Sequence, residues 1–552
     1  MSIGHAFLFL AVIWTTIHFL YRIWYRKGVY TLLPAYLGSS AHLYRSTKVS
    51  LNALQLKVST SQWNVHHDRL STTFTRKANR TMNTLFQAVY NVGIIFSAIG
   101  MLVAVGGLVW VSAGSAWTMF QKISLGNSSQ SHEASRLVKR LENTEDRKPI
   151  GTLPSAQFPG IIPIIPGITV PLSDLPIIIL AVFLSQVVHE LGHAVAAARE
   201  TLPIISAGLS FTICIPAAFV TFPTCGMKNL TAKARSRIIA AGPFHNLIFW
   251  CFLVLVTHSK VVNIFSVIFG YNNMSDTGKV VVAVNEDSPL SLYLLPGSVI
   301  TKLDDGPLTL SNDFWTEYLT GLPKFSSLGW CVSRSVLVKS DSCCTLLNTK
   351  ASPLACFESF DHSERGCLDP VPVLTRPSSN GRCAASKDCS EESTCVIPHE
   401  EAQLLRLSVR PRLDLTEETT ILWSGPRKEV WEEVQVGNWL PRFRLLPLGF
   451  PRLFTEFWNY LTMTTLSLYL FNLLPLAHLD GFELLQSLLD LAFTESSETF
   501  VYDIDALEAG EDHLESTRSR RRWKRWFTKY APILTTGLVL SCIMFAMINV
   551  IY

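Results

Sequence analysis

Long stretches without a charged residue dominate the pattern of hydrophobic and polar positions along the chain. A helix needs about 20 apolar residues to cross the hydrocarbon core of a bilayer. The uncharged stretches that satisfy or approach this requirement are 1–21, 81–121, 149–173 continued by 175–189, 201–227, 238–259, 457–479 and 531–552. This pattern predicts a polytopic α-helical membrane protein with about six transmembrane helices.

The stretch 201–227 differs from the others because Pro203, Gly208, Pro216 and Pro223 interrupt it. Irregular backbone at membrane depth is tolerated only where protein or a water-filled cavity surrounds it. We therefore predict a re-entrant or extended element that packs against protein.

The composition supports the membrane class. Hydrophobic residues make up 48% of the 552 residues and charged residues 16%, against about 25% charged residues in an average soluble protein. The net charge is only +4, and the basic residues cluster in the loops between apolar stretches. The expected surroundings are therefore a lipid bilayer, and no nucleic-acid partner is expected.

The loop charges predict a topology. Residues 22–87 contain ten Lys or Arg residues and one acidic residue, Asp68, which places this loop in the cytosol because basic loops stay on that side. Alternation from there predicts a first transmembrane helix 1–24, a basic cytosolic loop 25–87, a second transmembrane helix 88–118, a lumenal loop 119–167, a membrane core 168–259, a lumenal segment 260–453, a second part of the membrane core 454–494, a cytosolic loop 495–530 and a last transmembrane helix 531–552.

The lumenal segment begins with short β-rich runs separated by turn residues, between Val280 and Asn312, a pattern typical of a small β domain. It resembles a PDZ-like module, which we assign to 260–330 with a remainder at 401–453. Such modules often bind peptides by strand addition. A small β domain that only shields the membrane face is the alternative.

Eight of the twelve cysteines lie close together within 331–400, which we predict to be a disulfide-rich insertion into this module. They are Cys331, Cys343, Cys344, Cys356, Cys367, Cys383, Cys389 and Cys395. Disulfides require an oxidising compartment, in agreement with the lumenal placement, but their pairing cannot be deduced from sequence. A zinc cluster is the alternative, although no paired CxxC repeats occur.

The chemistry-bearing motif is His189-Glu190-Leu191-Gly192-His193, near the end of an apolar stretch. On a helix, two histidines four residues apart lie on one face and can bind one zinc ion, and the adjacent glutamate can act as general base. Zinc lowers the pKa of a water toward about 7 and polarises a scissile carbonyl. Ionisable residues in such a stretch are costly unless they are paired or bind a metal.

A catalytic zinc site usually has three protein ligands. Asp480 is the best third candidate, because it ends the uncharged stretch 457–479 and has the same desolvation problem as the histidines. His478 and His245 are alternative ligands. For His478 we favour a polar role in a broken helix, and for His245 hydrogen bonding around the site.

The HELGH motif and a distant NLLPLAHLDG together resemble the site-2 protease family of intramembrane metalloproteases. The second motif contributes Asn472, Pro475, Leu479, Asp480 and Gly481 at the fixed positions of the family's NxxPxxxLDG. Gly242 and Asn246 match a Gly-x-x-x-Asn element that the family has in the helix after HExxH. The resemblance implies one Zn²⁺ held by His189, His193 and Asp480, with Glu190 as the catalytic base. It also implies that Asn246, and by extension Asn472, positions the substrate or the oxyanion, while Gly242, Pro475 and Gly481 are structural.

The resemblance further implies cleavage of membrane-anchored substrates within their transmembrane segments, in the Golgi or endoplasmic reticulum. The family's substrates are transcription-factor precursors that have already been cut once on the lumenal side, and cleavage releases their cytosolic domains. Glycosylation sequons at Asn127 and Asn273 lie in predicted lumenal segments, where glycans can be attached.

Two other functions compete with this one. A CAAX-type membrane zinc protease also carries HExxH, but its third ligand is a glutamate on a later helix. A non-catalytic zinc-binding scaffold or transporter would have no need of a general base, so the intact Glu190 disfavours it.

Overall fold

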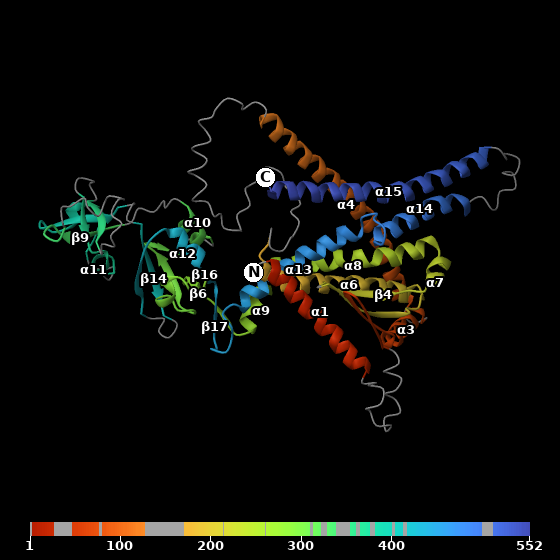
Figure 1. Ribbon diagram of the computed structural model, residues 1–552, viewed down its shortest axis with the longest axis horizontal. Coiled ribbons are helices and arrows are strands. Elements are labelled where there is room, and N and C mark those ends of the chain that lie inside the picture. The colour runs from red at the N-terminus through yellow and green to blue at the C-terminus, as the bar shows by residue number, and fades with distance from the viewer. Residues whose placement is uncertain are drawn as a thin grey trace, which may run out of the picture. The chain divides into compact units, whose positions relative to one another are not determined.

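The computed structural model describes residues 3–26, 47–76, 80–126, 170–213, 215–259, 261–309, 313–321, 328–337, 354–359, 365–375, 381–399, 403–411, 417–498 and 512–551. The chain divides into two compact units, which are coloured along the sequence in Figure 1. The membrane unit comprises Met1–His258 and Glu456–Tyr552, and the β unit comprises Ser259–Thr455.

Helices make up most of the membrane unit. They are α1 (Ile3–Arg26), α3 (Gln62–Thr75), α4 (Arg80–Gly126), the short 3-10 helix η3 (Leu172–Asp174), α6 (Leu175–Arg199), α7 (Thr224–Asn229), α8 (Ala232–His258), α13 (Phe450–Asn472, which begins in the other unit), α14 (Asp480–Glu498) and α15 (Asp512–Ile551).

Four helical segments among the described residues are long and apolar enough to cross a membrane. They are Arg80–Trp117, Leu172–Arg199, Ala232–His258 and Arg522–Phe545. Large apolar side chains on them are exposed, including Leu102, Leu255 and Leu534, as expected of surfaces that face lipid rather than water. The chain is therefore an integral membrane protein, and the total of six spanning helices stays a prediction.

Several helices are longer than the apolar stretches on which their prediction rested. α4 begins at Arg80 rather than at 88, and α15 begins at Asp512, inside the segment expected to be a cytosolic loop. Arg and Lys are good helix formers, so a helix can extend beyond its apolar part. α14 was not predicted as a separate helix.

A four-stranded antiparallel sheet lies in the membrane unit. Its strands are β1 (Thr47–Asn52), β2 (Gln55–Thr60), β3 (Ser206–Thr212) and β4 (Ile215–Thr221), in that order across the sheet. The predicted re-entrant or extended element 201–227 thus forms β3, β4 and α7. The basic segment 25–87 contributes β1, β2 and α3, which the sequence did not indicate. Figure 1 shows this sheet beside α6 and α3.

Small residues bring α6 and α8 close together. A side chain at Gly192 would place its Cβ 2.6 Å from the carbonyl oxygen of Ala241. Ala196 on α6 and Ala240 on α8 are also buried. Close contact through small residues is a common way for helices to pack in membranes, and here it presents the HExxH face of α6 to α8.

Buried hydroxyl pairs connect these helices to the C-terminal ones. Ser185 on α6 and Thr465 on α13 are 2.8 Å apart, as are Ser236 on α8 and Ser487 on α14. Hydrogen bonds between helices add to packing in a membrane. They hold α13 and α14 against the pair α6 and α8.

The β unit contains a six-stranded sheet with strands from both sides of the cysteine-rich insertion. The strand order is β15 (Thr419–Ser424), β14 (Leu404–Arg410), β7 (Val299–Leu303), β6 (Lys279–Val284) and β16 (Val434–Gly437), and β8 (Gly306–Pro307) pairs with β7. Its core packs against α10 (Phe314–Thr320) and α12 (Arg427–Glu433). The unit also holds α9 (Val261–Ile268), η4 (Pro289–Leu292) and a small sheet of β5 (Tyr271–Asn273) and β17 (Trp439–Pro441).

The insertion forms its own five-stranded sheet, in the order β11 (Arg365–Leu368), β10 (Ala355–Ser359), β13 (Ser393–Pro398), β9 (Gly329–Ser333) and β12 (Arg382–Cys383), with α11 (Pro370–Leu374) and η6 (Ser386–Asp388). Disulfides join Cys331 to Cys389 and Cys383 to Cys395. Cys356 and Cys367 are also disulfide-bonded, and Cys343 and Cys344 lie outside the described residues.

Charged residues connect the two larger sheets of the β unit. Arg406 on β14 donates to Asp305 at 2.6 Å, and Arg382 on β12 pairs with the same carboxylate. Both guanidinium groups lie over the ring of Trp330 on β9, at 4.6 and 4.0 Å from its centroid. Stacked and paired arginines fix the insertion against the module.

Candidate metal centre

The helix α6 presents both motif histidines to the protein interior. His189 and His193 are one turn apart, and only 6% and 8% of their surfaces are exposed. Pro176 in its first turn suits a helix start, where the missing N–H costs nothing, and the helix ends at Arg199. Because the apolar residues run all around α6, its orientation is set by the small residues that face α8 rather than by amphipathicity.

Asp480 is the first residue of α14, directly after a turn that follows α13. A carboxylate is favoured at a helix N-terminus, because backbone N–H groups and the helix dipole are directed toward it. Gly481 permits this turn, since a Cβ there would lie 2.3 Å from the carbonyl oxygen of Leu473. The turn therefore directs Asp480 toward α6.

Three potential ligand atoms meet between these helices. His189 Nε2 lies 2.8 Å from Asp480 Oδ2, His193 Nε2 lies 3.2 Å from the same oxygen, and the two Nε2 atoms are 3.1 Å apart. Within the described residues these side chains form a group whose ligand atoms all lie within 4.8 Å of one another. Two imidazoles and one carboxylate are a common ligand set for zinc.

The hydrogen bond on the far side of His193 suits metal binding. Its Nδ1 lies 2.8 Å from the carbonyl oxygen of Ile238 on α8. A carbonyl only accepts, so Nδ1 must carry the proton, and the neutral ring then has its lone pair on Nε2. That lone pair faces the other two ligand atoms. A hydrogen bond of this kind orients most metal-binding histidines.

Asn246 on α8 gives a second indication of a metal site, because one of its side-chain atoms has no hydrogen-bond partner among the described residues. Its side chain is fully buried, its Nδ2 lies 3.3 Å from His189 Nδ1, and its Oδ1 has no hydrogen-bond partner among the described residues. If His189 binds a metal through Nε2, its Nδ1 carries a proton and must donate. If the Asn246 amide is rotated by about 180°, its Oδ1 accepts from His189 Nδ1, and both groups then have a partner. These residues therefore fit a bound metal ion.

Gly242 on α8 leaves the space that the ligand atoms occupy. A Cβ at this position would lie 2.3 Å from His193 Nε2 and 2.7 Å from His189 Nε2. Any side chain here would displace the imidazoles. This position is therefore restricted to glycine by the site itself.

Glu190 lies on the neighbouring side of α6 and contacts the sheet. Its Oε2 accepts a hydrogen bond of 2.9 Å from the backbone N–H of Val220 on β4. The sheet thus holds the carboxylate of the one ionisable motif residue that is not a candidate ligand. Nothing in the sequence indicated Val220, because a backbone donor leaves no residue pattern.

The alternative ligands lie elsewhere. His245 donates from Nδ1 to the carbonyl oxygen of Ala241 at 2.8 Å, and its ring stacks on Tyr90 at 5.9 Å. His478 is exposed in the turn before α14, with a left-handed backbone at φ 72°. Neither belongs to the group of converging ligand atoms. Asn472 lies 3.5 Å from His189 Nδ1, beside Asn246.

A model of the peptidase M50 family matches residues 177–374, which include the HExxH motif. This part of the chain is similar to the peptidase M50 family. One relative, a membrane-bound transcription factor site-2 protease homolog from Arabidopsis thaliana, is 24% identical over 373 residues, which cover 58% of this chain and 71% of the relative. This likeness agrees with the predicted family and indicates a metalloprotease.

The M50 site is distinct from the cysteine cluster of the β unit. Cys331, Cys383 and Cys389 also bring three sulfur atoms within 4.8 Å of one another. All three are engaged in disulfides, and a sulfur atom in a disulfide is no thiolate ligand. The histidine and aspartate group is therefore the better metal site of the described residues.

An ion pair beside the M50 site was missed by sequence reasoning. Arg237 on α8 donates from Nε to Glu200, at the end of α6, at 2.7 Å, and its Nη1 donates to Asn91 on α4 at 3.2 Å. The residue after Arg237 is Ile238, whose carbonyl accepts from His193. Charged residues that border apolar stretches were the available signal, since in a membrane protein such residues are usually paired.

Proposed function

We propose that this protein is a zinc endopeptidase that cleaves membrane-tethered proteins within their transmembrane segments and releases their cytosolic parts. The observation that carries the proposal is the convergence of the buried His189 and His193 with Asp480, with Glu190 beside them, among helices long enough to span a membrane. The name of the Arabidopsis relative supports transcription-factor precursors as the substrate class.

The roles of the residues follow from their positions. His189, His193 and Asp480 hold the zinc ion, which when bound supplies a Lewis acid and lowers the pKa of water. Glu190 accepts the proton of the attacking water and delivers it to the amine that leaves. Asn246 orients His189, and Ile238 orients His193. The contacts of Asn246 and Asn472 with His189 favour an orienting role over the oxyanion role, which stays a prediction.

The hydrogen bond from the Val220 N–H holds the Glu190 carboxylate in one orientation for its role as general base. A carboxylate on a free side chain would sample several rotamers, and a hydrogen bond from the rigid backbone of β4 restricts them. One oxygen of Glu190 is held by Val220, while the other can accept a proton. The same contact joins the catalytic group to the edge of the sheet.

The cellular setting is proposed from the loop charges and the disulfides. The β unit lies in the lumen of the Golgi or endoplasmic reticulum, where its disulfides are stable. Asn273, an exposed residue of β5, accepts a glycan there, and Asn127 is a second candidate outside the described residues. The PDZ-like module then acts as a filter or a peptide-binding site on the lumenal side.

A helical substrate must unwind before cleavage, because its carbonyls are hidden in helical hydrogen bonds. The free edge of β4 offers partners to the unwound segment. Within the described sheet β4 is the last strand. Its residue Thr221 accepts from Ile205 on the inner side at 2.8 Å, whereas Val220 donates outward. Because direction alternates along a strand, Ala218 also points its backbone groups outward.

Replacement of Ala218 by proline tests this docking edge. The change removes one outward N–H, and proline is tolerated on edge strands, as Pro216 on the same strand already shows. We expect cleavage to fall by up to about tenfold, the effect of one lost hydrogen bond, while the zinc content stays unchanged. A wild-type rate of cleavage in a zinc-loaded Ala218→Pro protein would contradict docking along β4.

The proposed function itself is tested with purified protein in liposomes. The substrate is a single-span reporter with a short lumenal part, and mass spectrometry identifies the cleaved bond. We expect a cut inside the apolar segment and release of the cytosolic part. Cuts only in the soluble tails of the reporter would contradict an intramembrane protease.

A further inference from the structure

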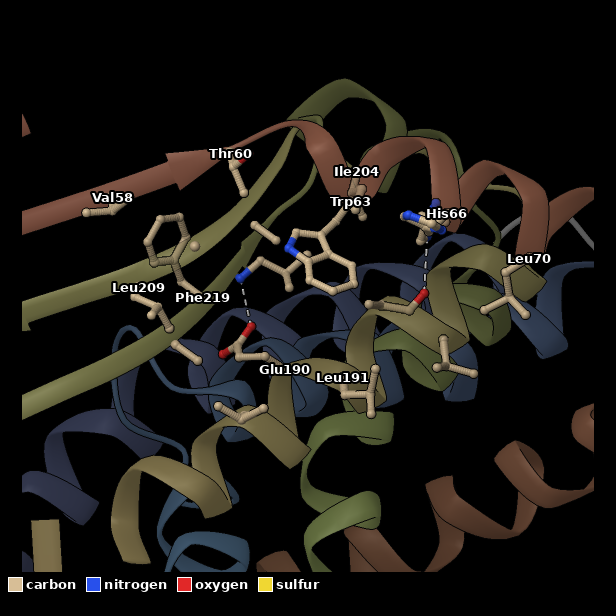
Figure 2. Close-up of a pocket in the computed structure, with 18 residues that line it drawn as sticks. Val58, Thr60, Trp63, His66, Leu70, Glu190, Leu191, Ile204, Leu209 and Phe219 are labelled. Atoms are coloured by element: carbon tan, nitrogen blue, oxygen red, sulfur yellow. Dashed lines mark hydrogen bonds between the residues drawn. The ribbon is translucent and has the colours of Figure 1, made fainter. Parts of the chain in front are cut away.

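A cavity of about 630 Å³ opens beside the catalytic glutamate. It lies between the sheet, α6 and α3, as Figure 2 shows, with Glu190 and Leu191 on one side and Trp63 across from them. Pockets of about 300–1,000 Å³ are the usual size of binding sites for small ligands. The cavity therefore has room for one or more large side chains.

The wall of the cavity that α3 forms is held in place by hydrogen bonds from α3 to α6 and to the residue before β3. His67 Nε2 on α3 lies 3.1 Å from the carbonyl oxygen of Ala194 on α6. Asn64 donates to the carbonyl of Ile205, just before β3, at 3.0 Å. The segment before α4, which carried no motif, thus supplies one wall.

The lining is apolar apart from Glu190 and a few groups on the α3 side. Val58, Leu209, Phe219 and Val220 come from the sheet, and Leu70 comes from α3. Trp63 is 61% exposed and points across the opening toward Glu190 in Figure 2. An apolar side chain that enters this cavity would gain close van der Waals contacts with these residues, which favours binding.

The small residues of the walls create the volume. Ala194 lies one turn after Glu190 on α6, and Ala207, Gly208 and Ala218 line the sheet side. Gly208 is required by the backbone, because a Cβ there would lie 2.0 Å from the carbonyl oxygen of Val58. At the alanine positions a larger side chain would instead fill the cavity.

We propose that this cavity is a specificity subsite that takes a large aliphatic or aromatic side chain of the substrate, on a residue that flanks the scissile bond. The inference rests on the proposed function. Glu190 lines the cavity and is bound to the edge strand β4, so a substrate extended along β4 passes the cavity beside the reacting carbonyl. Alternate side chains of an extended segment point to one face, and one of them enters the cavity.

The test uses wild-type protein, Ala218→Leu and the matched control Ala217→Leu in liposomes. Ala217 precedes Ala218 on β4 and does not line the cavity. Because successive side chains of a strand point to opposite faces of the sheet, this control makes the same change on the face away from the cavity. Single-span reporters carry Leu, Phe or Ala at each of the two residues that flank the mapped bond. Zinc content is measured for every protein, and Ala194→Leu serves as a second filling variant where Ala218→Leu does not fold.

Wild-type protein and Ala217→Leu are expected to cleave the Leu and Phe reporters at least about tenfold faster than the Ala reporter, a usual discrimination for apolar pockets. The filling variant is expected to lose that preference and to cleave the Leu, Phe and Ala reporters at similar rates. An equal loss on all reporters, with zinc retained, would overturn the subsite and favour a lipid chain in the cavity. If wild-type protein cleaves no reporter, the proposed function fails instead.

Discussion

Replacement of Glu190 by glutamine is expected to reduce cleavage by about 10²–10⁴-fold, the usual contribution of a general base, while zinc remains bound at the wild-type level. Glutamine has nearly the same shape and can still accept from the Val220 N–H through its amide oxygen, so the fold and the ligand group should survive. It cannot accept a proton at neutral pH. The measurement is the rate of reporter cleavage together with the zinc content of each protein.

Glu483 offers a matched control for this substitution. It is an exposed glutamate on α14, three residues after the ligand Asp480, and it is not part of the converging group. Glu483→Gln should cleave at close to the wild-type rate. Equal activity of Glu190→Gln and wild type would show that the proton is accepted by another group.

Gly242→Ala is expected to have the second-largest effect and to act through the metal. Its new Cβ would lie 2.3 Å from His193 Nε2, closer than any non-bonded contact allows, so the ring must move away from its ligand position. Disturbance of groups that support a metal site typically costs 10–100-fold in affinity. We expect at least a loss of that order in zinc affinity, measured by competition with a chelator, with a parallel loss of cleavage.

Gly106→Ala in α4 is the corresponding control, because a Cβ there has no heavy atom within 4 Å. Alanine is favoured over glycine inside a helix by roughly 0.5–1 kcal/mol, so this variant should be as stable as wild type or slightly more stable. Wild-type zinc affinity in Gly242→Ala would mean that the imidazoles have room to shift without losing the metal.

The candidate site was largely predictable because its residues belong to short motifs. The helical spacing of His189 and His193 places both rings on one face in any straight helix. Asp480 was found because a carboxylate at the end of an uncharged stretch needs a partner. The supporting contacts of Asn246 and Gly242 depend on how closely α6 and α8 approach, which no local pattern gives.

The sheet beside the site could not be predicted in the same way. β2 and β3 are separated by about 150 residues in sequence, from Gln55–Thr60 to Ser206–Thr212, and pair strand to strand. Pairing over such a separation is specified by the packed structure rather than by local sequence. The contact between Val220 and Glu190, the wall formed by α3 and the cavity all depend on that pairing.

The first and last residues of the membrane helices are difficult to predict from sequence for a related reason. Apolar composition defines the part of a helix that can lie in lipid, and backbone hydrogen bonds define the whole helix. α4 spans 47 residues and α15 spans 40, well beyond the roughly 20 that a bilayer requires. Polar residues that favour helices extend both elements beyond their apolar parts.

Removal and return of zinc tests whether cleavage depends on a metal ion held by this protein. Purified protein in liposomes is stripped with a chelator and refilled with stepwise additions of zinc, and the zinc per chain and the cleavage of the single-span reporter are measured in the same samples. We expect no cleavage without zinc and recovery in proportion to occupancy, with full activity at one zinc per chain. Cleavage at the undiminished rate in the zinc-free protein would contradict this expectation.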